Sequence, residues 1–304
     1  MNDLKALIKR NTKLFFKDKG TFFTSLITPL ILLFLYVCFL GNVYRDSFEM
    51  TFEQMNIGIT VPDKVLNALV SGQLFSSLLA VCCVTVAFCS NMIMVNDKVN
   101  GSRFDLTITP VKPSTMALGY YISTAISTLI ITFVAMVVCL IYVAATGWFM
   151  SVKDILLLVF DAFWLTMFGT ALSSVIIVFL SSQGQISAVG TIVSSGYGFI
   201  CGAYMPISQF SETLQNIIAL LPGTYGTSLV RTHAMNGSVL ELERLGFPSE
   251  VIESVKDTVD SNLYFFGAEV SELAKYGVLI GSVVLLIVAY IVINILRNKK
   301  PIAK

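Results

Sequence analysis

Few side chains in this sequence could take part in catalysis. The single histidine, His233, has no acidic residue or cysteine near it in the sequence, so we expect it in a surface loop. The chain has no G-x-x-x-x-G-K-[ST] phosphate loop, no G-x-S-x-G nucleophile turn and no H-E-x-x-H zinc motif. The six cysteines lie in or at the ends of apolar runs, where a thiol behaves as a small buried side chain. We therefore expect no catalytic residue and no metal site in this chain.

One ionisable side chain lies inside a strongly apolar run and is a candidate for a role in transport. Asp161 lies within the run 155–180, close to its first turns. Charged groups within a membrane are costly and usually functional, and ion-coupled transport needs such groups. Asp161 could contact a cationic substrate in a cavity, pair with Lys153, or stay hydrated near the membrane surface.

The polar connection 96–113, which reads NDKVNGSRFDLTITPVKP, is a second candidate. It is short and is held between two apolar runs. It could form a brief helix that presents its charged side chains to a partner protein. The alternative is an ordinary polar turn that only closes a helical hairpin.

Composition indicates what surrounds the chain. Of its 304 residues, 55% are apolar and only 13% are charged, and the mean hydropathy is +0.79. A soluble domain keeps about a quarter of its residues charged, because its surface faces water. Most of this surface must therefore face lipid. The net charge of +1 gives no indication of a nucleic-acid partner.

Membrane-spanning helices are predicted from runs of about 20 mostly apolar residues. Six runs meet this test, so we predict an all-α polytopic membrane protein that forms a single transmembrane domain over residues 1–304. The six runs are 22–41, 74–95, 115–146, 155–180, 185–206 and 275–296. The fifth run is rich in glycine and serine, which suit either close helix packing or a bend.

The distribution of Lys and Arg predicts the orientation of these helices. Residues 1–20 hold six such residues, the connection 96–113 holds three, and the C-terminal tail holds four. The remaining seven lie on the other side, where nine acidic residues fall between Glu212 and Glu272. We therefore expect both termini on the cytoplasmic side of the plasma membrane.

Two further segments lie outside these runs. Residues 1–20 combine an apolar face with many basic side chains, the pattern of a helix on an anionic membrane surface; the alternative is an unstructured basic tail. The outer region 207–273 contains two short apolar runs, the second at 225–230, which we expect to form short helices at the outer membrane face. Residues 251–259 then predict an amphipathic helix that faces water.

The order of these elements resembles the ABC-2 type permease family. The stretches that carry the resemblance are the basic N-terminal helix, NDKVNGSRFDLTITPVKPSTMALGYY (96–121) and GAYMPISQFSETLQNIIALLPGTYGTSLVR (202–231). Members have a cytoplasmic amphipathic helix, six spans, a cytoplasmic coupling helix between spans two and three, and short re-entrant helices before span six. The acidic segment 236–272 departs from this pattern, because it is longer than the link expected there.

The resemblance implies a half-transporter that is powered by a partner. Two such subunits, identical copies or a pair of paralogues, would form the translocation route, and two cytoplasmic ATPase subunits that bind ATP and Mg²⁺ would drive it. The segment 96–113 would then be the coupling segment, seated in a groove of the ATPase. The residues expected to make that contact are Asp97, Lys98, Arg103, Phe104 and Asp105. The residues expected to line the route, with core or lipid-facing packing as the alternative, are Phe75, Phe88, Met92, Asp161, Phe199 and Met205.

The resemblance implies export and leaves the substrate open. A route lined by Phe, Met, Val and small residues suits a drug-like, peptide or lipidic substrate. Export of a polysaccharide or lipid-linked glycan is the alternative within the family, and an ion-coupled secondary transporter is the alternative outside it. A membrane enzyme is a third class, for which the sequence offers no set of residues.

Overall fold

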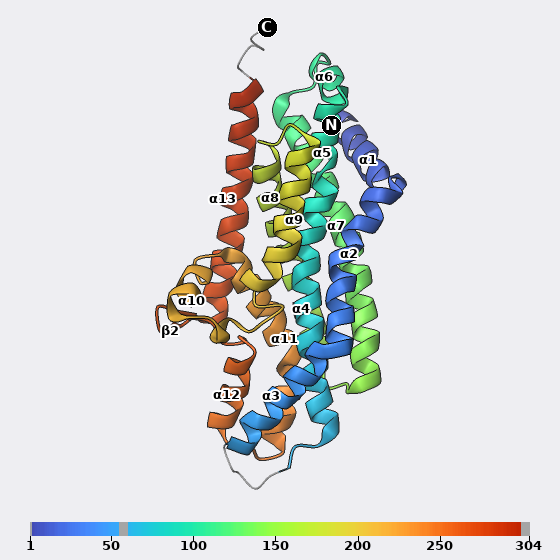
Figure 1. Ribbon diagram of the computed structural model, residues 1–304. Coiled ribbons are helices and arrows are strands. Elements are labelled where there is room, and N and C mark those ends of the chain that lie inside the picture. The colour runs from blue at the N-terminus through green and yellow to red at the C-terminus, as the bar shows by residue number, and fades with distance from the viewer. Residues whose placement is uncertain (1, 55–59, 299–304) are drawn as a thin grey trace.

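The computed structural model is an elongated bundle of helices that run roughly along one axis (Figure 1). It describes residues 2–54 and 60–298, and nearly all of that part of the chain is helical. The helices are α1 (Asn2–Lys17), α2 (Lys19–Leu35), α3 (Gly41–Gln54), α4 (Asp63–Asn91), α5 (Ile93–Val99), α6 (Ser102–Thr107), α7 (Pro113–Thr146), α8 (Val152–Ile177), α9 (Gln183–Ile200), α10 (Glu212–Ile218), α11 (Pro222–Arg244), α12 (Ser249–Thr258) and α13 (Glu272–Asn298). A π-helical stretch, Tyr36–Leu40, joins α2 to α3, and strands β1 (Tyr264–Phe265) and β2 (Ala268–Glu269) form an antiparallel hairpin.

The bundle has two distinct ends. The short helix α6, the start of α1 and the end of α13 lie towards one end, which we name the α6 end (Figure 1). Helices α3 and α12 lie at the opposite end, which we name the α12 end. The start of α1 and the end of α13 therefore lie on the same side of the bundle.

Five helical stretches of the described residues are long and apolar enough to cross a membrane. They are Lys19–Gln54, Asp63–Val99, Pro113–Thr146, Val152–Ile177 and Glu272–Arg297. Each overlaps one predicted run, which confirms an all-α polytopic membrane protein. The remaining run, 185–206, corresponds to α9, a helix of 18 residues that begins with the polar Gln183 and Gln185 and is not among these five stretches. The predicted count of six spans is therefore not confirmed.

Helix α4 is the centre of the bundle. Every residue from Ser71 to Asn91 is buried, because α2, α7, α8 and α11 pack around it. A helix enclosed in this way needs no single apolar stripe. Two glycines bring neighbouring helices close: a Cβ at Gly169 of α8 would lie 2.6 Å from a carbonyl oxygen of α4, and one at Gly72 would lie 3.2 Å from a carbonyl oxygen of α11. Small residues at such contacts let membrane helices pack closely.

Helix α1 packs along α7 near the α6 end. Leu7 and Phe15 are buried, and Leu7 lies against Gly119 of α7, where a Cβ would be only 3.0 Å from it. The lysines of α1 are exposed. Part of the apolar face of the N-terminal helix therefore contacts the protein itself. Its location on an anionic membrane surface stays a prediction.

The outer region 207–273 differs from the sequence prediction in one respect. Helix α10 is short, as expected, but the second apolar run, 225–230, is part of α11, a helix of 23 residues that packs against α4, α8 and α13. The prediction of a short helix there is wrong. Polar residues such as Arg231 and His233 interrupt the apolar pattern of α11, yet they are buried because they pair with groups elsewhere in the chain.

The predicted amphipathic helix in the acidic segment is confirmed. In α12, Val251, Ile252 and Val255 are buried, while much of the rest of the helix is exposed. Its apolar face packs towards α3 and α11, so α12 covers the α12 end of the bundle.

We expect Gly169→Ala to destabilise the protein, because the new methyl group would lie 2.6 Å from the α4 backbone. Adding a methyl group to a packed interior costs about 1–3 kcal/mol, so the purified chain should unfold several degrees lower in a thermal scan. Gly281→Ala in α13 is the matched control, since a Cβ there meets no atom within 4 Å. Equal unfolding temperatures for the two variants would contradict the close contact between α4 and α8.

Candidate functional site

The connection 96–113 forms an exposed tip at the α6 end. Helix α5 follows α4 after Met92, and Gly101, with a φ of 78°, makes the left-handed turn into α6. Glycine adopts this φ without steric cost. Phe104 of α6 is 58% exposed, and Ile108, directly after α6, is 70% exposed. Helix α6 itself lies at the tip of the bundle (Figure 1). Apolar side chains gathered on an exposed tip are typical of a protein contact.

Asp97 ties α5 to two other helices. Its two carboxylate oxygens accept hydrogen bonds of 2.7 Å and 2.8 Å from the Arg10 guanidinium of α1, and the hydroxyl of Tyr120 in α7 donates at 2.6 Å. The hydrogen bond to Asp97 also raises the pKa of Arg10. Asp97 is buried, so the structure assigns it to contacts inside the chain and corrects the expectation that it contacts a partner.

Lys98 ties α5 to the end of α8. Its Nζ atom donates to the carbonyl oxygens of Ile177, Val178 and Leu180 at 3.3 Å, 2.8 Å and 2.7 Å. The last carbonyls of a helix have no partner within the helix, and a cation there also interacts favourably with the helix dipole. Lys98 therefore caps the end of α8, and because it is only partly buried, its expected contact with a partner stays a prediction.

The other three predicted coupling residues lie on α6. Phe104 and Asp105 are exposed, and Arg103 is partly buried. Their expected contact with an ATPase stays a prediction. The structure adds Ile108, which directly follows α6 and which the sequence analysis did not single out. Helical spacing was the missed signal, because residues four apart share one face of a helix.

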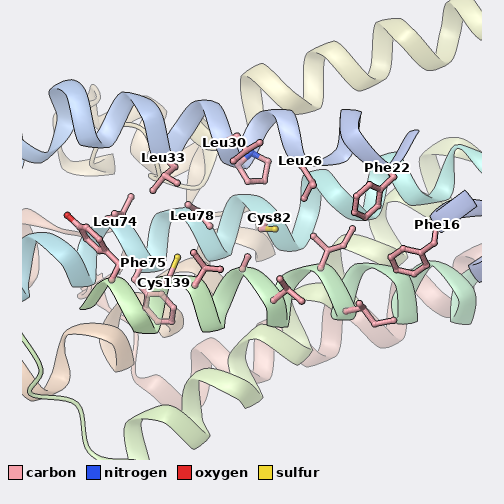
Figure 2. Close-up of a pocket in the computed structure, with 17 residues that line it drawn as sticks. Phe16, Phe22, Leu26, Leu30, Leu33, Leu74, Phe75, Leu78, Cys82 and Cys139 are labelled. Carbon is pink, nitrogen blue, oxygen red and sulfur yellow. The ribbon is translucent and has the colours of Figure 1, made fainter. Parts of the chain in front are cut away.

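The predicted route residues do not gather around one cavity. Phe75 lines an apolar cavity of about 540 Å³ between α2, α4 and α7 (Figure 2). Phe199 and Met205 line a second cavity of about 590 Å³, whose other walls come from the π-helical stretch and α3. The second cavity is also lined by Ser47, Thr51 and Gln54, so its walls are mixed in polarity.

Three predicted route residues lie outside these two cavities. Phe88 is 2% exposed and is part of the main hydrophobic core, so packing is its role. Met92 lies beside Asp18 at a smaller cavity of about 310 Å³. Asp161 is fully buried and contacts other polar side chains.

Asp161 is the centre of a polar cluster that joins three helices. Its Oδ2 atom lies 2.6 Å from Nδ1 of His233 in α11, and the hydroxyl of Tyr276 in α13 donates to Oδ1. On the other side of the imidazole ring, Nε2 lies 3.3 Å from Oε1 of Glu272, which is exposed. His233 is therefore buried in a helix, and its expected position in a surface loop is wrong. Lys153 is not the partner of Asp161 in this cluster.

The sequence analysis did not predict the Asp161 cluster, because its members are far apart in the sequence. Asp161 is 72 residues from His233 and 115 residues from Tyr276, so no local motif links them. One signal was present at the start of the last span, where Glu272 and Tyr276 are four residues apart and so share one helix face.

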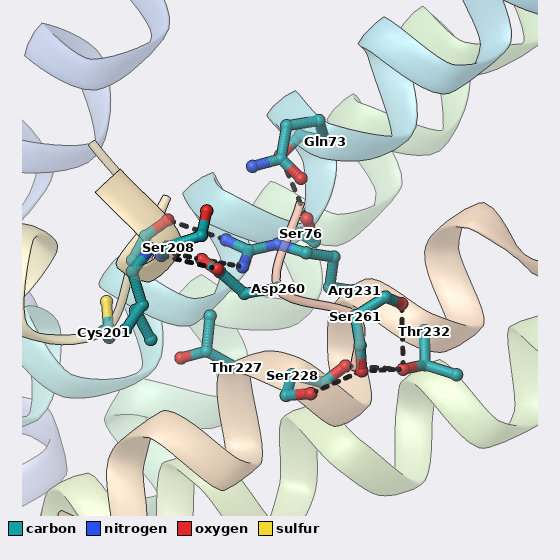
Figure 3. Close-up of polar contacts among 12 residues, drawn as sticks. Gln73, Ser76, Cys201, Ser208, Thr227, Ser228, Arg231, Thr232, Asp260 and Ser261 are labelled. Atoms are coloured by element: carbon teal, nitrogen blue, oxygen red, sulfur yellow. Dashed lines mark hydrogen bonds and ion pairs between the residues drawn. The ribbon is translucent and has the colours of Figure 1, made fainter. Parts of the chain in front are cut away.

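A second buried cluster fastens the segment after α9 (Figure 3). Arg231 of α11 is 1% exposed, donates to the Gly202 carbonyl at 2.8 Å and lies 3.4 Å from Asp260. Asp260 accepts backbone hydrogen bonds from Ile207 at 2.7 Å and Ser208 at 3.2 Å. Burial raises the pKa of Asp260, an effect that the Arg231 charge opposes. The chain reversal that follows α9 is therefore fixed to α11 and to the end of α12.

These contacts define a class of protein. Membrane-crossing helices surround a buried central helix, and a short helix projects at one end. Within residues 2–54 and 60–298, no group of three His, Cys, Asp or Glu side chains is placed to hold a metal ion. The chain is a polytopic membrane protein.

Comparison with protein families agrees with this class. A family model described as ABC-2 type transporter matches residues 2–234. The chain belongs to the ABC-2 type transporter family and is a permease subunit of an ABC transporter, a kind of subunit that is generally non-catalytic and acts with an ABC ATPase. The search of curated proteins found no match. The matched range includes α6 and ends inside α11, so the acidic segment 236–272 lies beyond it.

A double-mutant cycle should show strong coupling between Arg10 and Asp97. We expect Arg10→Ala and Asp97→Ala to destabilise the chain by less together than the sum of their single effects. The difference should be about 1.5–3 kcal/mol, as for a hydrogen bond to a charged group. Chemical or thermal unfolding of the purified variants measures it. Glu241 with Arg244 is the control, since Arg244 is exposed and such pairs couple by about 0.5 kcal/mol or less.

The Asp161 cluster should be needed for folding stability. Asp161→Ala and His233→Ala each leave a buried polar partner unpaired, and removing one member of a buried ion pair costs about 3–5 kcal/mol. We expect a sharp fall in the amount of monodisperse protein on size-exclusion chromatography in detergent. Glu272→Gln is the control, because that carboxylate is exposed. A stable Asp161→Ala protein would contradict a structural role for the cluster.

Proposed function

We propose that this permease subunit belongs to an ATP-driven exporter, in which a separate cytoplasmic ATPase subunit binds ATP and Mg²⁺. The observation that supports this most directly is the surface of α6, where Phe104 is exposed, while Asp97 and Lys98 of the preceding helix α5 are held by other helices of the chain. A large exposed aromatic side chain is a typical anchor for a partner pocket. Phe104, with Arg103 and Asp105 beside it, is the contact that the ATPase uses.

The connections of α5 explain how a push on α6 would reach the membrane. Asp97 joins α5 to α1 and α7, and Lys98 joins it to α8. A displacement of α6 therefore moves these helices together. A partner shifts the permease between states only if it binds those states with different affinity. The ATP-bound and ATP-free forms of the ATPase supply that difference.

The α6 end is the cytoplasmic end in this proposal, and the membrane is the plasma membrane. The basic N-terminal helix, the connection 96–113 and the end of α13 lie towards that end. The acidic helix α12 lies at the opposite end. This charge distribution supports the orientation, because cytoplasmic segments carry an excess of Lys and Arg.

A second permease copy completes the route. Helix α9 exposes Ala188, Thr191 and Ser195, which are small and spaced three or four residues apart. Such a face lets membrane helices approach closely. The cavity that contains Phe199 and Met205 lies at the end of the same helix, so it would open towards the interface between two copies.

The walls of that cavity support a drug-like, peptide or lipidic substrate. Phe39, Met50 and Phe199 supply apolar surface, and hydroxyl and amide groups lie among them. A strongly hydrated glycan would need more polar groups, although aromatic side chains stack on sugars. Ion-coupled transport receives less support, because Asp161 is already engaged by His233 and Tyr276.

Affinity purification from native membranes tests the proposal. A P-loop ATPase should co-purify in stoichiometric amount, and its ATP hydrolysis should be stimulated when the two proteins are reconstituted together. If the chain purifies alone and transports substrate under an ion gradient without ATP, the exporter proposal is wrong.

Phe104→Ala should weaken ATPase binding by about tenfold or more, because interface anchors often contribute 2 kcal/mol or more. Pull-down of the ATPase by the reconstituted permease measures this loss of affinity. The charge reversals Arg103→Glu and Asp105→Lys should in addition uncouple ATP hydrolysis from transport. Phe266→Ala is the matched control, since Phe266 is similarly exposed in the β hairpin. Unchanged binding after Phe104→Ala would remove α6 as the contact.

A further inference from the structure

The cavity between α2, α4 and α7 is a groove of nearly pure hydrocarbon (Figure 2). Its volume is about 540 Å³, within the range of small-molecule sites. All of its lining side chains are aliphatic, aromatic or thiol groups, and the phenol of Tyr142 is the only hydroxyl among them. The floor is formed by Phe75 and Cys82 of α4, which are buried. Such a groove suits an apolar chain.

The groove opens on the side of the bundle and not towards the core. Leu30 of α2 and Val134 and Val138 of α7 line it and are 58%, 61% and 55% exposed. These residues belong to two of the stretches that are apolar enough to cross a membrane. The open side of the groove therefore faces the hydrocarbon part of the bilayer.

The length of the groove matches one leaflet. On α7 it extends from Ile130 to Tyr142, a helical distance of about 18 Å at 1.5 Å per residue. On α2 it extends from Phe22 to Leu33, which is about 17 Å. The hydrocarbon core of a bilayer is about 30 Å thick, so each leaflet contributes about 15 Å. A single acyl chain would fill the groove lengthwise.

One end of the groove lies at the elbow between α1 and α2, which is basic. Phe16 and Phe22 line the groove there. Lys13 lies three residues before Phe16 on α1, and Lys19 lies three residues before Phe22 on α2, so each lysine shares a helix face with a groove residue. Both lysines are exposed, as is Lys17 between them.

The elbow also contains one acidic group. Asp18 caps α2, with its carboxylate accepting hydrogen bonds from the backbone N–H of Thr21 at 3.3 Å and from the Thr21 hydroxyl at 2.7 Å. The hydrogen bond from Thr21 lowers the pKa of Asp18, so this residue is ionised. Three lysines against one aspartate leave the elbow positive.

We propose that this groove binds one anionic phospholipid, with an acyl chain along α4 and the phosphate at the lysines of the elbow. The apolar groove supplies the contact for the chain, and the positive elbow selects a negative headgroup over a neutral one. A second copy of this protein is the competing occupant. A symmetric copy would place its own lysines at the same depth in the membrane, where the like charges of the two elbows would repel each other. This site does not rest on the proposed export function.

Lipid at this site would act on α1. The acyl chain contacts Phe16 near the end of α1, and Arg10 on the same helix holds Asp97. Occupancy of the groove would therefore hold α1, and through it α5, in one position.

Native mass spectrometry of the full-length chain in detergent tests this site. The chain is titrated with phosphatidylglycerol and with phosphatidylcholine of the same acyl chains, in the absence of any ATPase. We expect tighter binding of phosphatidylglycerol, and a loss of roughly fivefold for each lysine removed in Lys13→Gln/Lys19→Gln. Val134→Trp should weaken both lipids, because the indole fills the open side of the groove.

Lys5→Gln/Lys9→Gln is the matched control, since both lysines are exposed on α1 away from the elbow. Equal affinity for the two lipids would overturn the proposal, as would an equal loss in the control variant, which would indicate diffuse attraction only. Disulfide-linked dimers of a Val134→Cys variant would show that a second copy covers the groove. None of these outcomes depends on whether an ATPase co-purifies, so failure of this site and failure of the exporter proposal are distinguishable.

Discussion

The enclosure of α4 is the constraint on which the rest of the structure depends. Because α2, α7, α8 and α11 cover every side of its central part, α4 cannot shift without moving its neighbours. A polar contact adds to this enclosure at the end of α4, where the Asn91 amide donates to the hydroxyls of Ser173 and Ser174 of α8 at 3.2 Å and 3.0 Å. Since α5 begins directly after Met92, the orientation of α4 also sets the position of α6. A central helix that is fixed on all sides is a suitable support for α6, which we propose receives the push of the ATPase.

Buried charges then determine which helices stay in register. Apolar contacts in lipid are weakly specific, because lipid tails are as apolar as the side chains that they replace. An unpaired polar group in the same surroundings costs several kcal/mol. The Arg10–Asp97 pair lies near the α6 end, while the Asp161–His233 and Arg231–Asp260 pairs fasten α11 to other parts of the chain. Each pair joins segments far apart in sequence, so sliding one helix along another would break a pair as well as an apolar contact.

The sequence predicts the spans well and their polar contacts poorly, for a physical reason. Hydropathy is a local property, so five of the six predicted runs appear as membrane-crossing stretches. Helix α11 has low hydropathy because many of its residues are polar or charged, Arg231 and His233 among them, and tertiary pairing accompanies the burial of these two. The partners of the connection 96–113 could not be predicted for the same reason. Asp97 and Lys98 read as surface charges in an isolated loop, and nothing nearby in the sequence reveals that Arg10 and the end of α8 are their partners.

Helix α1 connects the lipid-facing groove with α5, the helix that leads to α6. Phe16, at the lipid-facing groove, is six residues from Arg10, which is about 9 Å along a rigid helix. Arg10 contacts Asp97 of α5, and α6 is the next helix in the chain. Suppose that an anionic lipid favours the position of α1 in which α6 binds the ATPase. Thermodynamic linkage then requires that the lipid raises the affinity for the ATPase by the same factor as the ATPase raises the affinity for the lipid. Both the lipid composition of the membrane and the binding of the ATPase would then shift the same equilibrium between positions of α1. The route between them is short and consists of a helix and one bidentate ion pair, which makes the coupling independent of any substrate.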